Sequence, residues 1–511
     1  MEGRTILGQP RGLATLFLTE MWERFTYYGV QSLLILFMVA PAASGGLGLN
    51  DKSAGSIYGL YVGSTYLLGL LGGWIADRLA GAQRSVVAGG ILIALGNTLL
   101  ALGTTAIFFV GLLVIAMGVG LLKPNVSALV ATLYPEGGAR RDAGFSIFYM
   151  GINTGGFLGP LLVPVVATAF GWRFGFALTA LGMALGVVQF LWTRRFLGEA
   201  GLAVAASERA SWTPVVLLFV LLGAAVLLAV TGAVHIDGAL LASFATWAFS
   251  FLAVAYFIYL LFFAGLSNPE RKRVLVMVAL FVASVTFWAG YFQQGGSFNL
   301  FAARYTDLHV LGWNMPPGVL QAVNSLFVII FAGAFAALWI ALGKRDRDPP
   351  VTAKFGVGLL LLGLGFLVMY FAAQHVPAGR LVLPTWLLGT YFLHVCGELC
   401  LSPVGLSNMS KLVPPRFVGQ AMGMWFLSLA LGGNLAGQLT GQYDASHLES
   451  LPALFLRIFW YGVIAGAVML LLTPAARRLN PSDWHSSGSR AAAPARRRSA
   501  GRSGPASPPR C

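Results

Sequence analysis

The chain has 511 residues, of which 57% are hydrophobic and only 10% are charged, and its mean hydropathy is +0.77. Soluble domains carry about 25% charged residues, so this composition excludes a soluble enzyme of this size. The formal net charge of +15 would indicate a nucleic-acid partner in a soluble protein. Here the Lys and Arg residues occupy short loops and a tail, so they indicate orientation in a membrane, and no nucleic acid is expected to bind.

A membrane-spanning helix needs roughly 20 apolar residues to cross the hydrocarbon core. The chain contains fourteen such stretches. They lie at about 12–40, 53–77, 85–105, 107–133, 143–170, 174–197, 214–232, 239–264, 273–303, 318–343, 354–373, 382–410, 417–443 and 453–476. We therefore expect an all-α polytopic membrane protein with 14 transmembrane helices.

The positions of the basic residues predict how the chain crosses the membrane. If the N-terminus is cytoplasmic, the loops on the opposite side hold only Lys52, Arg173, Arg304 and Arg380, with Arg457 near that surface. The basic residues of the other loops and of the C-terminal tail are then cytoplasmic, as the positive-inside rule requires. Both termini are therefore expected in the cytoplasm of a bacterial cell, with the protein in its inner membrane.

The spacing of spans and loops indicates an arrangement of six, two and six helices. A cytoplasmic N-terminus at 1–11 precedes an N-terminal six-helix bundle at 12–197. A cytoplasmic linker and two accessory transmembrane helices follow at 198–272, and a C-terminal six-helix bundle occupies 273–476. The accessory helices lack intramembrane charges, so we expect a lipid-facing hairpin. The basic tail at 477–511 is rich in Pro, Ser, Ala, Gly and Arg and is expected to be cytoplasmic and disordered.

A charged cluster lies in the middle of the first span. Its polar residues recur at helical spacing and share one face: Glu20, Glu23, Arg24, Tyr27, Tyr28 and Gln31. A charged side chain at the bilayer centre costs about 2.5 to 3.5 kcal/mol, so this face is expected to line a protein interior or a water-filled pathway. The alternative is a neutralised ion pair that only fixes helix packing.

A lysine, Lys123, lies in the middle of the fourth span, directly before Pro124. A lysine buried in a membrane needs a counter-charge. Glu20 and Glu23 of the first span are its expected partners. The alternative is a fixed lysine–glutamate tie that has no role in transport.

Other polar residues mark the fifth span and the second bundle. Asn153 is flanked by glycines in the fifth span, and Asn324 lies near the start of the tenth. Glu398 is the only clear mid-membrane acid of the second bundle. His394, one helical turn earlier, is placed to hydrogen-bond Glu398, and we favour such a local bond over a proton relay.

Several blocks resemble known transporters. The turn at Gly73–Arg84, between the second and third spans, resembles the loop signature of the major facilitator superfamily. Glu20–Gly29 resembles the ExxERFxYYG motif of the proton-dependent oligopeptide transporter family, also written POT/PTR. Blocks at Gly118–Asn125, Phe148–Gly155 and Gly397–Pro403 resemble further motifs of that family.

This resemblance extends over about residues 10–475 and implies a major facilitator fold, in which two six-helix bundles enclose a central peptide cavity. By position, the residues that resemble the family's groups for the peptide carboxylate are Arg24, Tyr28 and Lys123. Those that resemble its groups for the peptide amino end are Asn153, Asn324 and Glu398. The resemblance further implies side-chain pockets lined by Tyr66, Trp425 and Phe426. It also implies proton coupling through Glu20 and Glu23 with Arg24 and Lys123.

One departure from the family concerns the ninth span. Many members carry an acid there that faces an arginine of the first span, whereas this chain has Gln293 and Gln31 at those positions. We expect the two glutamines to hydrogen-bond each other as a gate on the outer side. Because a neutral amide does not titrate, proton coupling is then expected to rest on Glu20 and Glu23, with help from Glu398.

These features predict a proton-coupled symporter that imports di- and tripeptides by alternating access. The first alternative is a proton-coupled exporter of the facilitator type, or a transporter of another small organic substrate. A binding or sensor protein that has lost transport is a further alternative. The expected partners are the peptide, protons and the lipid bilayer, and the protein is expected to act as a monomer.

No enzyme is expected, because the chain has no His-Glu-x-x-His motif and no serine paired with a plausible base. The three cysteines, Cys396, Cys400 and Cys511, form neither a disulfide framework nor a zinc pattern. No metal or cofactor is therefore expected, and the driving force is the proton gradient.

Overall fold

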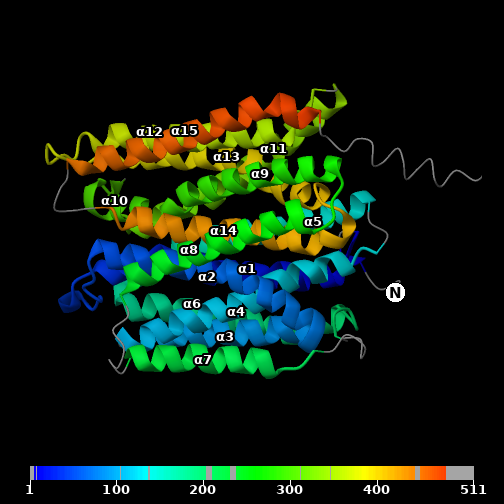
Figure 1. Ribbon diagram of the computed structural model, residues 1–511. Coiled ribbons are helices and arrows are strands. Elements are labelled where there is room, and N and C mark those ends of the chain that lie inside the picture. The colour runs from blue at the N-terminus through cyan, green and yellow to red at the C-terminus, as the bar shows by residue number, and fades with distance from the viewer. Residues whose placement is uncertain are drawn as a thin grey trace, which may run out of the picture.

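The computed structural model describes residues 5–6, 8–103, 105–135, 138–202, 210–230, 237–310, 312–345, 347–443 and 449–478. Figure 1 shows long helices running side by side, with the N-terminus and the end of the last helix at the same end of the molecule. We call this the proximal end, and the opposite end, where the first helix leads into the second, the distal end. The tail beyond Arg478, for which disorder is expected, lies outside the described residues.

Fifteen α-helices make up almost the whole described fold. They are α1 (Arg11–Val39), α2 (Asp51–Ile75), α3 (Ala82–Leu102), α4 (Thr105–Thr132), α5 (Gly138–Phe170), α6 (Trp172–Thr193), α7 (Thr213–Val230), α8 (Gly238–Ile258), α9 (Asn268–Tyr291), α10 (Ser297–Tyr305), α11 (Ala322–Lys344), α12 (Val351–Ala373), α13 (Thr385–Lys411), α14 (Val418–Thr440) and α15 (Ser450–Arg477). Backbone groups find no water in a bilayer core, so continuous helices satisfy them internally.

Short elements connect or extend these helices. The 3₁₀ turns are η1 (Ala42–Ser44), η3 (Arg194–Phe196), η6 (Phe292–Gly295), η7 (Pro317–Gln321) and η8 (Pro415–Phe417), and the π turns are η2 (Ala76–Ala80) and η5 (Tyr259–Phe263). Strands β1 (Thr5–Ile6) and β2 (Gln9–Pro10) form one antiparallel hairpin, and β3 (His309–Val310) and β4 (Trp313–Asn314) form another.

Every predicted span coincides with a helix, and one of them is broken. The ninth span consists of α9, the turn η6 and the short helix α10. Gly295 and Gly296 lie at this break, where the low helix propensity of glycine favours an interruption. Ten of the described helical segments are long and apolar enough to cross a membrane.

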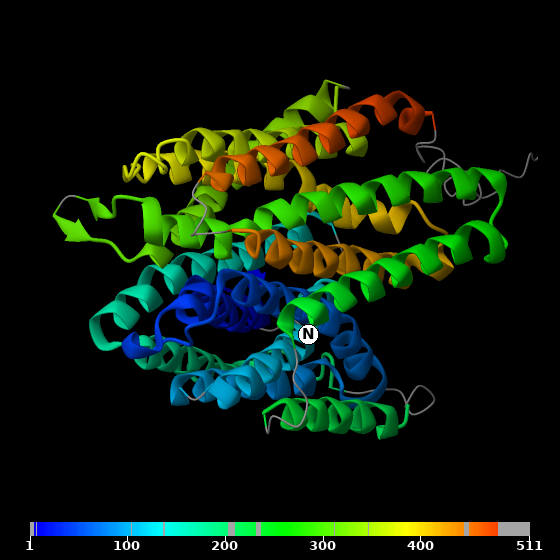
Figure 2. The same cartoon turned by 60° about the vertical axis from the view of Figure 1, so that its left-hand side comes forward.

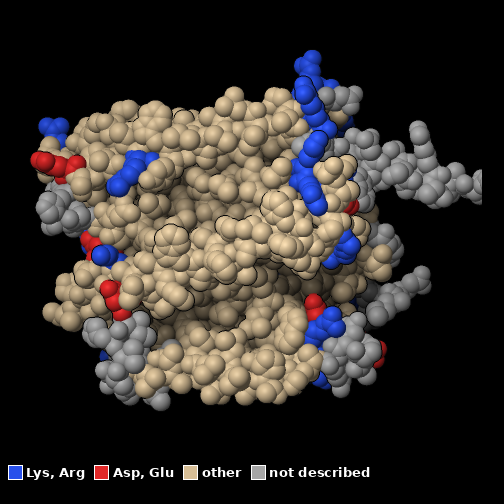
Figure 3. Space-filling model, in the orientation of Figure 1, with Lys and Arg blue, Asp and Glu red and all other residues tan. Residues whose placement is uncertain are grey.

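The helices form two bundles that are stacked in Figure 1. In the first, α1 packs against α5 and α6, and α3 packs against α4 and α6. In the second, α12 packs against α13 and α15, and α14 packs against α9. Figure 3 shows Lys, Arg, Asp and Glu gathered at the two ends of this face, while the broad middle band carries none. An uncharged band of this kind is the surface that a lipid bilayer covers.

The two bundles meet most closely where α2 crosses α14. A Cβ atom added to Gly59 of α2 would lie 2.8 Å from the Cα atom of Gly437. One added to Gly437 would lie 2.4 Å from the carbonyl oxygen of Gly55. Small residues let helix backbones approach this closely in a membrane. This contact holds the bundles together in the distal half of the molecule.

The accessory helices lie on different parts of the surface, as Figures 1 and 2 both show. Helix α8 packs against α2 and α14, whereas α7 contacts α4. The amide nitrogen of Asn434 on α14 donates to the Ala242 carbonyl and to the Thr246 hydroxyl of α8, both at 2.7 Å. Gln438 donates to the Thr246 hydroxyl at 2.6 Å. Helix α8 is therefore bound to the second bundle by hydrogen bonds and also touches the first.

The linker after α6 begins on the turn between α2 and α3. The buried amide of Gln83 donates to the carbonyls of Gly198 and Ala200 at 3.0 and 2.7 Å. Gly81 has a positive φ of 84°, and a Cβ atom there would lie 2.8 Å from the Gly201 carbonyl oxygen. The turn that resembles the facilitator signature thus holds the start of the linker.

Candidate functional site

The charged face of α1 is built around Arg24. Its Nε atom contacts Glu23 Oε2, and its Nη2 atom donates to Glu23 Oε1 at 2.5 Å. Glu20 Oε1 lies 3.5 Å from the same Nε atom. The three side chains are at most 2% exposed. A bidentate pair of this kind is among the stronger charged contacts in proteins.

Two tyrosines of α1 cover the guanidinium of Arg24. Its central carbon lies 4.7 Å from the ring centre of Tyr27 and 5.7 Å from that of Tyr28. Tyr27 is buried, whereas Tyr28 remains partly exposed. Tyr28 also interacts electrostatically with Glu398 of the second bundle.

Lys123 does not make the expected direct contact with an acid. Among the described residues, no carboxylate lies within 4.0 Å of its ammonium. The ammonium lies instead 4.6 Å from the ring centre of Tyr66, in a cation–π contact. Glu20 and Glu23, the expected partners, are paired with Arg24 and interact with Lys123 only electrostatically, from beyond 4.0 Å. Lys123 is only partly buried.

On the second bundle, Glu398 belongs to a chain of hydrogen bonds with no cation. The hydroxyl of Tyr291 on α9 contacts Glu398 Oε2, and it lies 2.9 Å from Oδ1 of Asn324 on α11. No Lys, Arg or His among the described residues forms an ion pair with Glu398. Tyr291 is not among the residues predicted for the site. Its position two residues before Gln293, in the same part of the ninth span, is the sequence signal that could have identified it.

His394 does not hydrogen-bond Glu398, contrary to the local bond that we favoured. Its Nε2 atom lies 3.2 Å from the Leu362 carbonyl oxygen on α12. Its ring packs against Phe298 and Phe366, with centroids 5.6 and 5.1 Å away. The imidazole therefore belongs to the interior of the second bundle, because a neighbouring helix offers an acceptor.

The remaining predicted binding residues differ in accessibility. Asn153 is 7% exposed, and its amide donates to the Tyr149 carbonyl of the preceding turn at 2.9 Å. Trp425 is 4% exposed and packs tightly against Gly405, where an added Cβ atom would lie 2.3 Å from its ring. Phe426 is partly buried. Trp425 of α14 is thus packed closely against α13, and Phe426 next to it retains more exposure.

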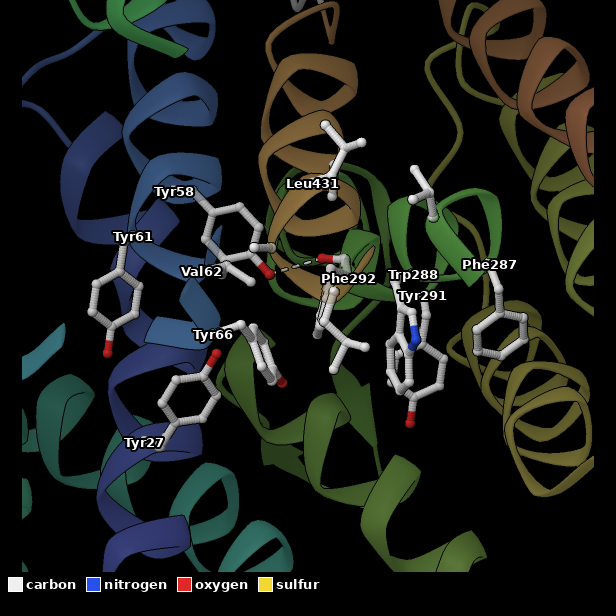
Figure 4. Packing of buried hydrophobic residues seen from close by; sticks show 14 of the residues in the cluster. Tyr27, Tyr58, Tyr61, Val62, Tyr66, Phe287, Trp288, Tyr291, Phe292 and Leu431 are labelled. Carbon is white, nitrogen blue, oxygen red and sulfur yellow. Dashed lines mark hydrogen bonds between the residues drawn. The ribbon is translucent and has the colours of Figure 1, made fainter. Parts of the chain in front are cut away.

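Tyr66 connects the two bundles through aromatic contact. Its ring centre lies 5.7 Å from that of Phe292 in η6. Figure 4 shows the tyrosines of α1 and α2 on one side and Phe287, Trp288 and Tyr291 of α9 on the other, with Phe292 between them. Phe292 therefore joins the aromatic side chains of the two bundles.

The expected hydrogen bond between Gln31 and Gln293 is absent. The amide of Gln31 donates to the Tyr58 hydroxyl at 3.0 Å. Gln293 donates to the Ala289 and Ala436 carbonyls at 3.2 and 2.9 Å, and its oxygen accepts from Ser297 and Thr440. The prediction is wrong for this conformation, because the polar groups of α14 and α10 satisfy Gln293 within its own bundle.

Three other contacts join the bundles at the distal end. The Tyr58 hydroxyl donates to the Phe292 carbonyl at 2.8 Å, and this bond is drawn in Figure 4. Asn299 donates to the Ser32 carbonyl at 2.9 Å. Arg304, at the end of α10, forms a bidentate ion pair with Asp51, at the start of α2, with distances of 2.7 and 2.8 Å. No sequence spacing pairs these residues, because they lie in different bundles.

Comparison with known proteins gives consistent matches over most of the chain. The family model of the POT family matches residues 83–454. The chain is 41% identical to the peptide transporter YePEPT of Yersinia enterocolitica, over 93% of this chain and 96% of that protein. It is 33% identical to the di-/tripeptide transporter of Lactococcus lactis subsp. cremoris, over 92% of this chain and 96% of that protein.

Solved structures agree with these matches. A variant of a peptide transporter POT, in complex with alafosfalin, superposes with a TM-score of 0.85 at 41% identity, covering 93% of this chain and 97% of that one. A POT family transporter in complex with 5-aminolevulinic acid superposes with a TM-score of 0.83 at 30% identity, covering 92% and 98%. The chain therefore belongs to the POT family of proton-dependent oligopeptide transporters and has the major facilitator fold.

Proposed function

We propose that this protein is a proton-coupled symporter that imports di- and tripeptides by alternating access. The observation that carries the proposal is the difference in charge between the two walls. The first bundle holds the cations Arg24 and Lys123, and the second holds Glu398, an acid without a cation. The ammonium of a zwitterionic peptide supplies Glu398 with a cation, and its carboxylate supplies Lys123 with an acid. Membership of the POT family supports the same conclusion.

The peptide is proposed to bind across the cavity between these walls. Its carboxylate meets Lys123, Arg24 and Tyr28, and its ammonium meets Glu398 and Asn324. A dipeptide spans roughly 7 Å between its ends, at about 3.3 to 3.6 Å per residue. Tyr28, whose ring centre lies 5.7 Å from the central carbon of the Arg24 guanidinium, lies on the carboxylate side of this site. Asn153 adds a polar group to the amino end, and Tyr66, Phe426 and Trp425 are assigned to the side-chain pockets.

Proton coupling is proposed to work by exchange of partners on α1. Glu23 occupies Arg24 in the observed conformation, with Glu20 next to it. A proton on Glu23 removes this partner and leaves the Arg24 cation for the peptide carboxylate. Proton and peptide then favour each other's binding through a shared partner. Lys123, which has no bound acid, is ready to receive the carboxylate at any time.

The distal contacts are proposed to form the outer gate, with the proximal end and both termini in the cytoplasm. The distribution of Lys and Arg supports this orientation by the positive-inside rule. The conformation described here is then closed to the outside by Asp51–Arg304, Tyr58–Phe292 and the α2–α14 contact. Gln31 contributes a hydrogen bond to the Tyr58 hydroxyl, and Gln293 of η6 contributes a hydrogen bond with Ser297. The complete site lies within one chain, which supports a monomer.

A second candidate substrate class is favoured by one comparison. A POT family transporter that is 30% identical to this chain binds 5-aminolevulinic acid. This molecule carries an amino and a carboxylate end, like a short peptide. Small amino acids with separated charges are therefore the alternative substrates for the same site.

Reconstituted liposomes test the proposed function. We expect uptake of a labelled dipeptide when the proton gradient is directed inward, and loss of accumulation when an uncoupler removes the gradient. Labelled 5-aminolevulinic acid, offered in parallel, decides between the two substrate classes. A protein that transports neither molecule, with or without a gradient, would contradict the proposal.

A further inference from the structure

We propose that Tyr291 is a positioning residue that turns the amide of Asn324 according to whether Glu398 carries a proton. The inference rests on the proposed function, in which Asn324 and Glu398 meet the amino end of the substrate. The consequence is that the charge of Glu398 and the orientation of the Asn324 amide change together. Protonation of Glu398 then weakens binding of a free amino group at two positions rather than one.

The starting point is a conflict in the hydrogen bonds of Tyr291. Its hydroxyl contacts Glu398 Oε2 and, at 2.9 Å, Asn324 Oδ1. A tyrosine hydroxyl has one proton, and both of these oxygens are acceptors when Glu398 is ionised. One proton cannot satisfy both acceptors at once. The three groups must therefore adopt one of two arrangements.

In the first arrangement Glu398 is ionised and only accepts. Tyr291 then donates its proton to the carboxylate, since a charged acceptor makes the stronger bond. The Tyr291 oxygen needs a donor on its other side, which Asn324 supplies by turning its amide so that the NH₂ group faces the phenol. The last torsion of asparagine allows this half-turn. The carbonyl oxygen of Asn324 is then directed away from Tyr291.

In the second arrangement Glu398 is protonated and donates to the Tyr291 oxygen. Tyr291 then donates to Asn324 Oδ1, which matches the contact seen in the structure. The NH₂ group of Asn324 is now directed away from Tyr291, and it makes no hydrogen bond to the described residues. Asn324 is 7% exposed, and its NH₂ nitrogen is not among the fully buried polar atoms without a partner.

The two arrangements offer opposite surfaces to an ammonium group, which needs acceptors. Ionised Glu398 presents a carboxylate together with the Asn324 carbonyl oxygen. Protonated Glu398 presents a neutral acid together with an NH₂ donor. The discrimination in favour of a free amino group therefore changes with the proton on Glu398 by more than the acid alone would produce.

No other charged group near Glu398 obscures the way in which its protonation changes the preference for a free amino group. The titratable groups that face it are Tyr291 on α9, Tyr28 on α1 and Tyr149 on α5. Within the described part of the chain it has no ion-pair partner. His394 on the same helix is bonded to the Leu362 carbonyl of α12. Gln293, two residues after Tyr291, is neutral and adds no titrating group beside Glu398.

The test compares binding of a dipeptide and its N-acetylated analogue to purified protein from acidic to neutral pH. For the native chain, we expect the preference for the free amino group to fall as the pH is lowered, by on the order of tenfold more than Glu398 alone would cause, the equivalent of one hydrogen bond. In Tyr291→Phe, the preference for the free amino group should fall at low pH only by the smaller amount that protonation of Glu398 alone causes. Glu398→Gln should remove the pH dependence.

Tyr391→Phe is the matched control, because Tyr391 is a buried tyrosine of α13 that packs against Phe298 and has no contact with Glu398. It should behave like the native chain. If Tyr291→Phe keeps the full pH dependence and weakens both ligands equally, Tyr291 only fills space, and the inference is overturned. The acetylated analogue reports such a general loss.

A second measurement separates this inference from the proposed function. Infrared difference spectra, assigned with Glu398→Gln, follow the carboxyl band of protonated Glu398 without any peptide. We expect this band to shift in Tyr291→Phe, because the acid loses its acceptor, and to stay in place in Tyr391→Phe. A native chain that binds neither ligand would contradict the proposed function, and the infrared result would still decide the role of Tyr291. A carboxyl band of Glu398 that does not shift in Tyr291→Phe would overturn the inference about Tyr291.

Discussion

The two walls of the candidate site carry charge in opposite ways. On the first bundle, the acids Glu20 and Glu23 are buried together with Arg24, and Lys123, close to Tyr66, balances their formal charge. On the second bundle, a single acid, Glu398, is held only by neutral groups. We therefore propose that the first wall exchanges ion-pair partners when it binds a substrate, whereas the second wall only needs a cation. Proton coupling is then expected to depend mainly on the first bundle.

The largest effect is expected from breaking the charge balance of the first wall. Glu23→Gln and Lys123→Ala should each abolish accumulation of peptide driven by the proton gradient. Glu23→Gln keeps an oxygen for Arg24 but removes the charge that a proton would neutralise. Lys123→Ala removes the cation of this wall that has no carboxylate within 4.0 Å among the described residues. Uphill uptake and peptide counterflow, measured in the same liposomes, separate loss of coupling from loss of binding.

Lys344→Ala, at an exposed lysine at the end of α11, is the control for these variants and should transport normally. Normal uphill uptake by Glu23→Gln or Lys123→Ala would remove that residue from the coupling mechanism. The assignment would then pass to Glu20.

The next effect concerns Gln293, which carries no charge in this chain. Gln293→Glu loses the donor that binds the Ala289 and Ala436 carbonyls and places an unpaired acid there. An uncompensated buried charge costs about 3–5 kcal/mol, so we expect strongly reduced uptake and a lower melting temperature. Thermal unfolding and uptake assays measure the two losses.

A second test places a pair of opposite charges at positions 31 and 293. If Gln31 and Gln293 faced each other, Gln31→Arg combined with Gln293→Glu should recover much of the loss. The observed contacts join Gln31 to Tyr58 instead, so we expect the double variant to be no better than the product of the two single variants. Clear recovery in uptake would mean that the two side chains meet in another conformation of the transport cycle.

A smaller effect is expected from neutralising the second wall. Glu398→Gln should weaken binding of a dipeptide with a free amino group by roughly ten- to a hundredfold, because a hydrogen bond to a charged group contributes about 1.5 to 3 kcal/mol. The N-acetylated analogue should lose much less. Equal losses for both ligands in a binding titration would assign Glu398 to conformation or to protons rather than to the amino group.

The smallest effect is expected at the distal ion pair, which is partly exposed to solvent. Asp51→Asn or Arg304→Gln should favour opening of the distal end by roughly 1 kcal/mol, a value discounted because such pairs are screened by water. Electron paramagnetic resonance measures this opening as the distance between spin labels placed at Lys52 and Gln442 in a Cys511→Ser background. The charge-reversed double variant, Asp51→Arg with Arg304→Asp, should return the distances toward the native ones. Unchanged distances in the single variants would show that glycine packing closes this end alone.

Much of the fold follows from the sequence by local rules. A bilayer requires long apolar segments and satisfies their backbones only as helices, so composition in a window of about 20 residues places each span. Helical periodicity likewise placed Glu20, Glu23 and Arg24 on one buried face, where the structure has them. The break of the ninth span into α9 and α10 has a local sign in Gly295 and Gly296.

The partners of these residues were decided only by the tertiary structure. His394 binds Leu362 rather than Glu398, Tyr291 joins Glu398 to Asn324, and Asp51 meets Arg304 across the two bundles. Such pairings depend on how each helix is rotated and tilted against its neighbours. Packing between helices sets those angles, since lipid provides no hydrophobic drive that would fix them from one helix alone. A single span therefore determines that a polar residue needs a partner, and only the assembled bundles determine which partner it has.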